Sequence, residues 1–315
     1  MPVRPHGRLD IVIVNYETPA LLDKCLRSVT DYTSDVIAQV VVVDNSATPT
    51  AAQQVVDRHP AVRLLRSTTN VGYGSAANRG IAATDGEYAL VLNADAVLHA
   101  GAAEALIDEL DLHRDTGVVG PRLVDAQDRV QPSCARFPTP GGVFVQETGL
   151  WKLVRSPKYG QSARPFFDLD APGVVPWVLG AALAIRRGPF DAVGGFDPAY
   201  FMYYEEVDLC RRLVAKGVQT RFTPAATIGH IGGASTILNP APMRREMFRS
   251  LARYTRRHGR DPWLLRLRLA VVAVAATRIA RDLVSRIWRD GSRSNQPARA
   301  WLAIIADALT GWPDE

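Results

Sequence analysis

Residues 194–213 read GGFDPAYFMYYEEVDLCRRL, and the rest of the chain is organised around this stretch. A glycine pair and several aromatic residues lead into a segment whose pattern predicts a helix over residues 205–216. At about 100° per residue, Glu206 falls in the middle of the apolar arc, whereas Glu205 and Asp208 fall outside it. The macrodipole favours acids in a first helical turn, which accounts for Glu205 and Asp208. An inward-facing carboxylate is costly unless a charge, a proton or a substrate meets it, so Glu206 is a candidate catalytic residue.

The first part of the chain alternates between apolar strands and helices. Four runs rich in Val, Ile and Leu are predicted as strands: residues 9–14, 39–43, 62–66 and 88–92. Thr-Pro pairs after the first two strands supply a cap and a proline for the helices that follow. This alternation predicts an open, mostly parallel, Rossmann-like α/β sheet.

Polar side chains follow the ends of the predicted strands. They are Asn15, Tyr16, Asp44, Asn70, Asn93 and Asp95. Ligands of open α/β sheets bind beyond the carboxyl ends of the strands, near the point where the strand order reverses. We therefore predict a ligand site along this edge of the sheet.

The pattern is less regular in the second half. Residues 133–176 are rich in proline, glycine and aromatics, and fit either a lid or wall of the site or an ordinary surface loop. Residues 177–187 are predicted to form one buried strand, in which Gly180 allows close backbone approach. A late strand over 218–222 precedes a loop that carries His230.

The cysteines and the first residues indicate the compartment. Cys25, Cys134 and Cys210 lie far apart without CxxC spacing, which indicates neither a disulfide framework nor a zinc site. The opening MPVRPHGR runs directly into the first strand, so we expect no signal peptide and a cytoplasmic location.

The net charge of +5 is unevenly distributed. Fifteen arginines and four acidic residues lie between Arg244 and Arg299, whereas residues 1–243 carry a net charge of −3. The longest charge-free stretch of the tail, residues 269–277, has nine residues, well short of the roughly 20 that span a bilayer. With its tryptophans, the tail suits helices lying on an anionic membrane surface. A helical appendage that forms oligomers is the alternative, and no recognition motif supports nucleic-acid binding.

Two motifs suggest ligands. Residues 72–77 match the GxGxxA dinucleotide fingerprint, but the first strand-to-helix turn, where that fingerprint belongs, has no glycine, so NAD binding is weakly supported. Gly72 still permits the loop to approach a diphosphate or sugar. Asp95, in Asn-Ala-Asp after a buried strand, offers the oxygen that a hard divalent cation prefers. With His230 and the downstream carboxylate pair it makes a coherent set for a metal ion and a base.

Together these segments resemble the family 2 inverting glycosyltransferases of the GT-A fold, over about residues 9–235. The matching segments, in the family's order, are IVIVNY, VVVDNSA, NVGYGSAANRGI, LNADA, WVLGAALAIRR, GGFDPAYFMYYEEVDLCRRL and GHIGGAST. Within the family the chain is most similar to bacterial rhamnosyltransferases that extend lipid-linked GlcNAc in cell-wall or O-antigen assembly. The resemblance implies a nucleotide-diphospho-sugar transferase domain over residues 1–239. The composition of residues 240–315 predicts a basic, amphipathic helical region after it.

The resemblance also implies roles for particular residues. Asp44 would read the nucleotide base. Asp95 would bind Mg²⁺ or Mn²⁺ on the diphosphate, assisted by His230. Glu206 would be the general base, with Glu205 as the alternative. The further donor-binding candidates are Asn15, Tyr16, Asn70, Gly72, Tyr73, Asn78, Asn93 and Ala94, and the acceptor-side candidates are Trp177, Gly180, Tyr203 and Asp208.

The implied reaction moves L-rhamnose from dTDP-rhamnose to a polyprenyl-diphosphate-linked GlcNAc, with the enzyme peripheral on the inner face of the membrane. Two departures from the family pattern matter: Asn93 replaces an acid of the metal motif, and the acidic pair is Glu-Glu where many relatives have Glu-Asp. The alternatives are a UDP-sugar-dependent member with another acceptor, a non-catalytic sugar-nucleotide-binding relative and an NAD-linked enzyme.

Overall fold

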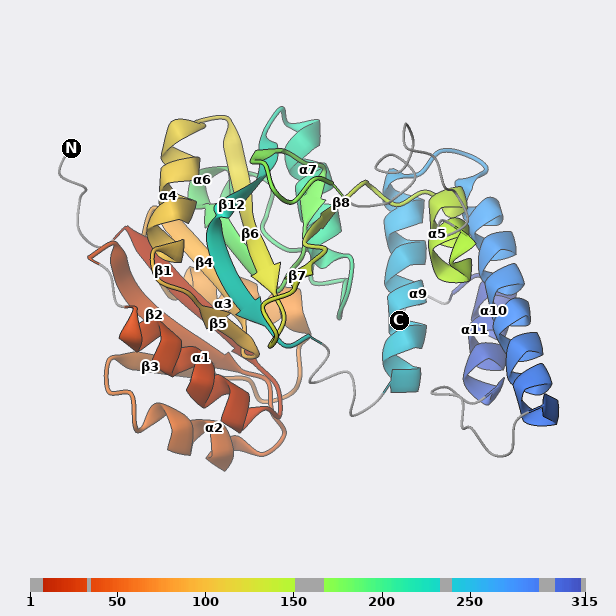
Figure 1. The fold of residues 1–315 in the computed structure, drawn as a ribbon, viewed down its shortest axis with the longest axis horizontal. Helices are drawn as coiled ribbons and strands as arrows, with labels where there is room; N and C mark the ends of the chain where they lie inside the picture. The colour runs from red at the N-terminus through yellow and green to blue at the C-terminus, as the bar shows by residue number, and fades with distance from the viewer. Residues whose placement is uncertain (1–7, 33–34, 151–166, 233–239, 289–297, 313–315) are drawn as a thin grey trace. The chain divides into compact units, whose positions relative to one another are not determined.

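The computed structural model describes residues 8–32, 35–150, 167–232, 240–288 and 298–312, which form two compact units. The first contains the sheet and its helices, and comprises the described residues up to Phe137 together with residues 167–232. The second comprises helices of residues 138–150, 240–288 and 298–312 (Figure 1).

The main sheet of the first unit has the strand order β3-β2-β1-β4-β11-β6-β12-β5 (Figure 1). Its strands are β1 (Leu9–Asn15), β2 (Ile37–Asp44), β3 (Val62–Arg66), β4 (Tyr88–Asn93), β5 (Ala96–Leu98), β6 (Thr116–Val124), β11 (Ala182–Arg186) and β12 (Gln219–His230). The first four are mutually parallel, and β11 is antiparallel to both β4 and β6. Because β12 pairs parallel with β6, its carboxyl end lies at the same edge of the sheet as those of β1, β2 and β4. The sheet is therefore open, mixed and mostly parallel.

Short strands and helices complete this unit. The strands β7 (Val130–Gln131) and β9 (Gly173–Val174) extend the sheet, and β8 (Cys134–Ala135) pairs with β10 (Trp177–Val178). The helices are α1 (Pro19–Asp31), α2 (Pro49–Val56), α3 (Tyr73–Ala82), α4 (Ala102–Leu112), α6 (Arg187–Ala192) and α7 (Glu205–Ala215). All three cysteines are buried free thiols.

The strands are apolar on both sides because each face of the sheet is covered by helices. Along β1, Leu9, Ile11 and Ile13 belong to a core with residues of α1, α2 and α4, whereas Val12 and Val14 belong to a second core with α3 and α7. This alternation follows from the two-residue period of a strand.

Two segments differ from the prediction. The run over residues 177–187 forms the two strands β10 and β11 rather than one, and Arg187 begins α6. Residues 179–181 separate the strands, and Gly180 lies beside Glu206. The predicted late strand extends well past residue 222, so His230 is the last residue of a strand rather than part of a loop.

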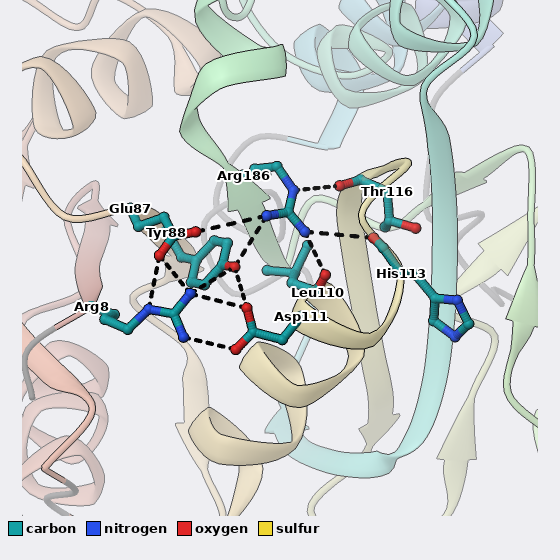
Figure 2. Close-up of polar contacts among 8 residues, drawn as sticks. All are labelled: Arg8, Glu87, Tyr88, Leu110, Asp111, His113, Thr116 and Arg186. Atoms are coloured by element: carbon teal, nitrogen blue, oxygen red, sulfur yellow. Dashed lines mark hydrogen bonds and ion pairs between the residues drawn. The ribbon is translucent and has the colours of Figure 1, made fainter. Parts of the chain in front are cut away.

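A polar network at the amino end of β4 joins distant parts of this unit, and Figure 2 shows that it centres on Tyr88. The Tyr88 hydroxyl donates to Asp111 Oδ1 at 2.6 Å and accepts from Arg8 at 3.0 Å and from Arg186 at 3.1 Å. Both guanidinium groups also lie over the Tyr88 ring, 4.9 and 5.2 Å from its centroid. The hydrogen bond from Arg8 lowers the pKa of Asp111 to about 2, and burial raises the pKa of Tyr88 to about 12.

Arg186 stabilises the carboxyl end of α4, whose last turn has no basic residue of its own. Its guanidinium donates to the carbonyl of Leu110 and, at 3.0 Å, to that of Thr116 (Figure 2). A cation at a helix carboxyl end interacts favourably with the macrodipole and satisfies carbonyls that have no partner within the helix.

Arg186→Met should therefore lower the free energy of unfolding by about 3 kcal/mol, because buried carbonyls and the Tyr88 hydroxyl lose a charged donor. Arg114→Met is the matched control, because Arg114 follows the same helix but is exposed. Urea denaturation of both variants measures the difference. Equal stabilities would show that the Arg186 contacts contribute nothing net.

The second unit is a helical bundle. Its helices are α5 (Pro140–Thr148), α9 (Pro240–His258), α10 (Trp263–Trp288) and α11 (Ala298–Thr310). Arg245 and Arg249 form ion pairs with Asp307, and Arg244 with Glu147, so part of the arginine excess stabilises the bundle itself. Among the described residues, no helix combines the length and apolar character needed to cross a bilayer.

The segment predicted as a lid or surface loop, residues 133–176, divides between the units. Its helix α5 packs with α10 in the second unit, although the sequence boundary at residue 239 had placed it with the sheet. Residues 151–166 of the predicted segment lie outside the described residues.

Candidate active site

The carboxyl edge of the sheet gathers most of the predicted polar residues. Asn15 ends β1, Asp44 ends β2, Asn93 ends β4 and His230 ends β12. Because these strands run in one direction, their ends meet along one edge, as the sequence predicted.

Asp44 is buried and held in one orientation. Its Oδ1 accepts hydrogen bonds from Asn15 Nδ2 at 2.8 Å and from the Ser46 hydroxyl at 2.7 Å. Ser46 also accepts from the backbone N–H of Glu17, which fixes the loop after β1 against the loop after β2. Tyr16 in that loop is 39 % exposed and is available to a ligand at this edge.

Gly72 has a different reason to be glycine from the predicted approach to a diphosphate. It adopts φ = 84°, and a Cβ there would lie 2.2 Å from the carbonyl oxygen of Phe201. Tyr73 N–H donates to that same carbonyl at 3.0 Å, and Asn70 Oδ1 accepts from Gly72 N–H at 3.0 Å. The second glycine of GxGxxA, Gly74, is also constrained by packing, because it lies against the side chain of Phe196. The loop thus docks the segment before α7.

Asn78 and Ala94 make contacts within the fold, and their donor-binding role stays a prediction. The Asn78 side chain donates to Phe196 O at 2.7 Å and accepts from Phe196 N–H at 2.9 Å, which uses both ends of its amide. Ala94 is buried in the core, and its N–H donates to Val14 O.

The helix-wheel expectation for the acidic residues of α7 holds for Glu206 and is wrong for the other two. Glu205, Glu206 and Asp208 are all buried. Asp208 has no exposed surface and forms a 2.6 Å ion pair with Arg212, whose guanidinium also donates to the carbonyls of Val193 and Gly195. Asp208 therefore anchors the glycine turn through Arg212, and its acceptor-side role stays a prediction.

The Glu206 carboxylate is the polar group best placed for proton transfer. Burial raises the pKa of Glu206 to about 7, although the backbone N–H groups of Gly180, Glu206 and Val207 donate to the carboxylate and oppose the shift. Its Oε2 is buried and has no hydrogen-bond partner among the described residues. A carboxylate whose pKa lies near neutrality and whose second oxygen is unused is suited to act as a general base.

Tyr73 and Gly180 position this carboxylate. A Cβ on residue 180 would lie 3.8 Å from Glu206 Oε1, so Gly180 borders the carboxylate directly. The Tyr73 hydroxyl donates to Gly180 O at 2.5 Å. Burial, with Glu205 and Glu206 nearby, raises the pKa of Tyr73 well above its usual value, so the hydroxyl stays a donor.

The backbone before α7 is strained. Tyr203 and Tyr204 both have positive φ, 68° and 66°, which non-glycine residues seldom adopt. Tyr204 occupies the N-cap position of α7, so this bend sets the direction in which Glu205 and Glu206 enter the helix. Trp177, the remaining acceptor-side candidate, is partly exposed and donates from Nε1 to Arg136 O at 2.9 Å.

Asp95 and His230 meet through strand pairing. The ladder between β5 and β12 aligns His230 with Ala96, and His230 Nε2 lies 3.6 Å from Asp95 Oδ1. Burial lowers the pKa of His230, an effect that the Asp95 carboxylate opposes. A carboxylate oxygen and an imidazole nitrogen this close, without a hydrogen bond between them, fit two ligands of one divalent cation. No cluster of three or more acidic, histidine or cysteine ligands occurs among the described residues, so a cation here would take its other ligands from a diphosphate and water.

Three residues of this region were not predicted from the sequence: Ser46, Gln131 and Arg212. Gln131 contacts His230 twice: its Nε2 donates to the His230 carbonyl, and its Oε1 lies 3.1 Å from His230 Nδ1. Ser46 and Arg212 lie within the segments VVVDNSA and GGFDPAYFMYYEEVDLCRRL, whereas Gln131 lies in none of the matching segments. Ser46 has the clearest signal, because it follows Asp44 closely enough to form a hydrogen bond with its side chain.

Comparison with solved structures defines the fold. The mannosyltransferase PcManGT from Pyrobaculum calidifontis, solved with GDP-Man and Mn²⁺, superposes with a TM-score of 0.56 at 18 % identity, covering 98 % of this chain and 86 % of that one. GalNAc-T7, solved with UDP, GalNAc and Mn²⁺, also gives a TM-score of 0.56, at 16 % identity over 79 % of this chain and 48 % of that chain. The fold is that of the GT-A glycosyltransferases.

Sequence comparison then places the chain in a family. Residues 10–161 match the model of Glycosyl transferase family 2. The N-acetylglucosaminyl-diphospho-decaprenol L-rhamnosyltransferase of Mycobacterium tuberculosis is 33 % identical over 252 residues, which cover 74 % of this chain and 79 % of that protein. Rhamnosyltransferase WbbL of Escherichia coli is 46 % identical over 52 residues, 16 % of this chain and 20 % of that protein. The chain belongs to glycosyl transferase family 2 and is a glycosyltransferase.

Proposed function

We propose that the protein is an inverting, metal-dependent rhamnosyltransferase that moves L-rhamnose from dTDP-rhamnose to the GlcNAc of a polyprenyl-diphosphate-linked acceptor. The observation that carries the catalytic part is the buried Glu206 carboxylate, which has a pKa of about 7 and an Oε2 without a hydrogen-bond partner in the part of the chain that the structure describes. The sugar is supported by the similarity to the mycobacterial and E. coli rhamnosyltransferases, and the acceptor by the similarity to the mycobacterial enzyme alone.

The donor would lie along the carboxyl edge of the sheet. Asp44, oriented by Asn15 and Ser46, would accept hydrogen bonds from the nucleotide base. Asp95 and His230 would hold a divalent cation, Mg²⁺ or Mn²⁺, which when bound would neutralise charge on the departing diphosphate.

Glu206 would act on the acceptor. Its Oε2 would accept the proton of the acceptor hydroxyl as the hydroxyl oxygen attacks the anomeric carbon. The N–H of Gly180 would hold the carboxylate in place by donating a hydrogen bond to it. One in-line attack without a covalent intermediate inverts the configuration at that carbon.

A donor survey tests this proposal. Membranes containing polyprenyl-diphosphate GlcNAc would be incubated with the protein and radiolabelled dTDP-rhamnose, UDP-sugars or GDP-sugars, with Mn²⁺ or with EDTA. We expect metal-dependent transfer from dTDP-rhamnose alone. Transfer from a UDP-sugar would refute the rhamnose assignment, and nucleotide binding without any transfer would favour the non-catalytic reading.

The second unit would hold the enzyme on the cytoplasmic face of the membrane. On α10, Leu265 and Leu269 lie one turn apart and are 56 % and 63 % exposed, and the exposed Arg266 lies beside them. On α11, Leu302 and Leu309 share one side of the helix and are similarly exposed. Exposed leucines next to arginines suit a helix seated among anionic headgroups.

Replacing Leu265 and Leu269 together with serine should weaken binding to vesicles containing anionic phosphatidylglycerol by about tenfold or more, because apolar burial in the bilayer is lost. Flotation measures the bound fraction. Leu112→Ser is the control, because Leu112 is at least as exposed as these leucines but belongs to the sheet unit. Unchanged vesicle binding together with loss of a wild-type dimer in light scattering would assign these leucines to a second copy instead.

A further inference from the structure

Gln131 contacts His230 through both ends of its side-chain amide. Gln131 lies at the end of β7, whose pairing with β6 aligns it with Leu123. The adjacent strand β12 is in turn aligned with β6, and this brings Gln131 beside His230. Gln131 Nε2 donates to His230 O at 2.8 Å, and Gln131 Oε1 lies 3.1 Å from His230 Nδ1.

These two contacts determine each other. A backbone carbonyl can only accept, so the NH₂ end of the Gln131 amide must face His230 O. The amide oxygen therefore faces Nδ1, and because that oxygen can only accept, Nδ1 must carry the proton. A neutral imidazole protonated on Nδ1 has a lone pair on Nε2, the atom that faces Asp95 Oδ1 at 3.6 Å.

We propose that Gln131 is a positioning residue that fixes the Nδ1–H tautomer of His230 and so keeps Nε2 available, together with Asp95, as a ligand for a divalent cation. The ligand role rests on the metal site of the proposed function, whereas the tautomer itself does not. Without Gln131, the ring can place its proton on Nε2 and donate it to Asp95. Nε2 and Oδ1 would then be joined by a hydrogen bond, and a cation could bind them only after that bond was broken.

The tautomer can be measured in the full-length protein without any metal. Long-range ¹H–¹⁵N spectra of protein labelled in its six histidines distinguish the two tautomers, and His230→Asn identifies the His230 signal. At pH 8 the wild type should show the Nδ1–H pattern and Gln131→Met the Nε2–H pattern. An Nε2–H pattern in the wild type, or an unchanged Nδ1–H pattern in Gln131→Met, would overturn the inference.

Metal binding tests the consequence. Mn²⁺ titrations followed by electron paramagnetic resonance, in the presence of dTDP, should show about 10- to 100-fold weaker binding in Gln131→Met. Gln131→Glu should recover part of the loss, because its carboxylate still accepts from Nδ1 but cannot donate to His230 O. Gln127→Met is the matched control, because Gln127 is exposed on the same hairpin and contacts Arg129. Equal Mn²⁺ affinity in wild type and Gln131→Met would refute the positioning role.

The two proposals fail in different ways. If the wild type binds no Mn²⁺ with dTDP yet shows the Nδ1–H pattern, the metal site is refuted while the effect of Gln131 on the tautomer stands. If the wild type binds Mn²⁺ but shows the Nε2–H pattern, the metal site stands and the role of Gln131 is refuted.

Discussion

Glu206→Gln should reduce the rate of sugar transfer about 10²- to 10⁴-fold, with little change in donor binding. Glutamine is nearly isosteric and its amide oxygen can still accept from Gly180 N–H, so the helix start should keep its geometry. What is lost is the proton acceptor at Oε2, the oxygen that has no partner among the described residues. Initial rates at saturating donor, compared with nucleotide affinity by calorimetry, separate the two effects.

The pH dependence should identify the base. Glu206 must be ionised to accept a proton, and burial raises its pKa to about 7, so wild-type activity should fall as the pH drops through 7. Residual activity of Glu206→Gln should lack that limb. Glu205→Gln is the informative comparison, because Glu205 is the alternative base and is also buried. If Glu205→Gln removes the acid limb and Glu206→Gln keeps it, the assignment of the base is wrong.

Glu206→Gln, which should lower the transfer rate, should raise the free energy of unfolding above neutral pH. Because the pKa of Glu206 is higher in the folded protein than its ordinary value of 4.5, the folded state is favoured at low pH. That stabilisation is fully present below about 4.5 and is lost as the pH rises through 7, where the buried carboxylate ionises. A shift of this size corresponds to about 3 kcal/mol, so Glu206→Gln should be more stable than wild type at pH 8 by up to that amount. Urea denaturation at pH 5 and pH 8 measures the difference.

The strands of this fold could be predicted because burial on both faces leaves a continuous apolar run. The third strand, Val62–Arg66, has the predicted bounds, and β1 is one residue longer than predicted, since it ends at Asn15. The run over residues 177–187 misled the prediction, because residues buried beside an active site can be as apolar as a central strand. At its interruption Gly180 borders Glu206, a neighbour that the pattern of residues 177–187 cannot indicate.

The wheel argument identified Glu206 but not its buried neighbours. A wheel considers only the helix itself, whereas Asp208 is covered because Arg212 holds it against the carbonyls of the glycine turn. The candidate donor-binding asparagines raise the same difficulty. Asn15, at the end of β1, orients Asp44, whereas Asn78, within α3, forms hydrogen bonds with the backbone of Phe196. The role of each asparagine depends on which residue, distant in the sequence, forms hydrogen bonds with its side chain.

Gly72→Ala should be the most damaging single substitution in the loop before α3, lowering the free energy of unfolding by at least about 3 kcal/mol. Gly72 has φ = 84° and ψ = 169°, a conformation that is essentially restricted to glycine. An added Cβ would also lie 2.2 Å from Phe201 O, and that atom is backbone that accepts from Tyr73 N–H. Either the loop or the segment before α7 must move.

Gly101→Ala separates the two causes, because Gly101 also has positive φ, 75°, but a Cβ there would meet nothing within 4 Å. Its cost should be about 1 kcal/mol, from backbone strain alone. Thermal unfolding of both variants should therefore differ by several degrees, at about 2–4 °C per kcal/mol for a unit of this size. Displacing Phe201 should also disturb the bend at Tyr203 and Tyr204, so Gly72→Ala should lose transfer activity at least tenfold at temperatures where it remains folded. If Gly72→Ala is as stable and as active as Gly101→Ala, the docking of this loop does not position the start of α7.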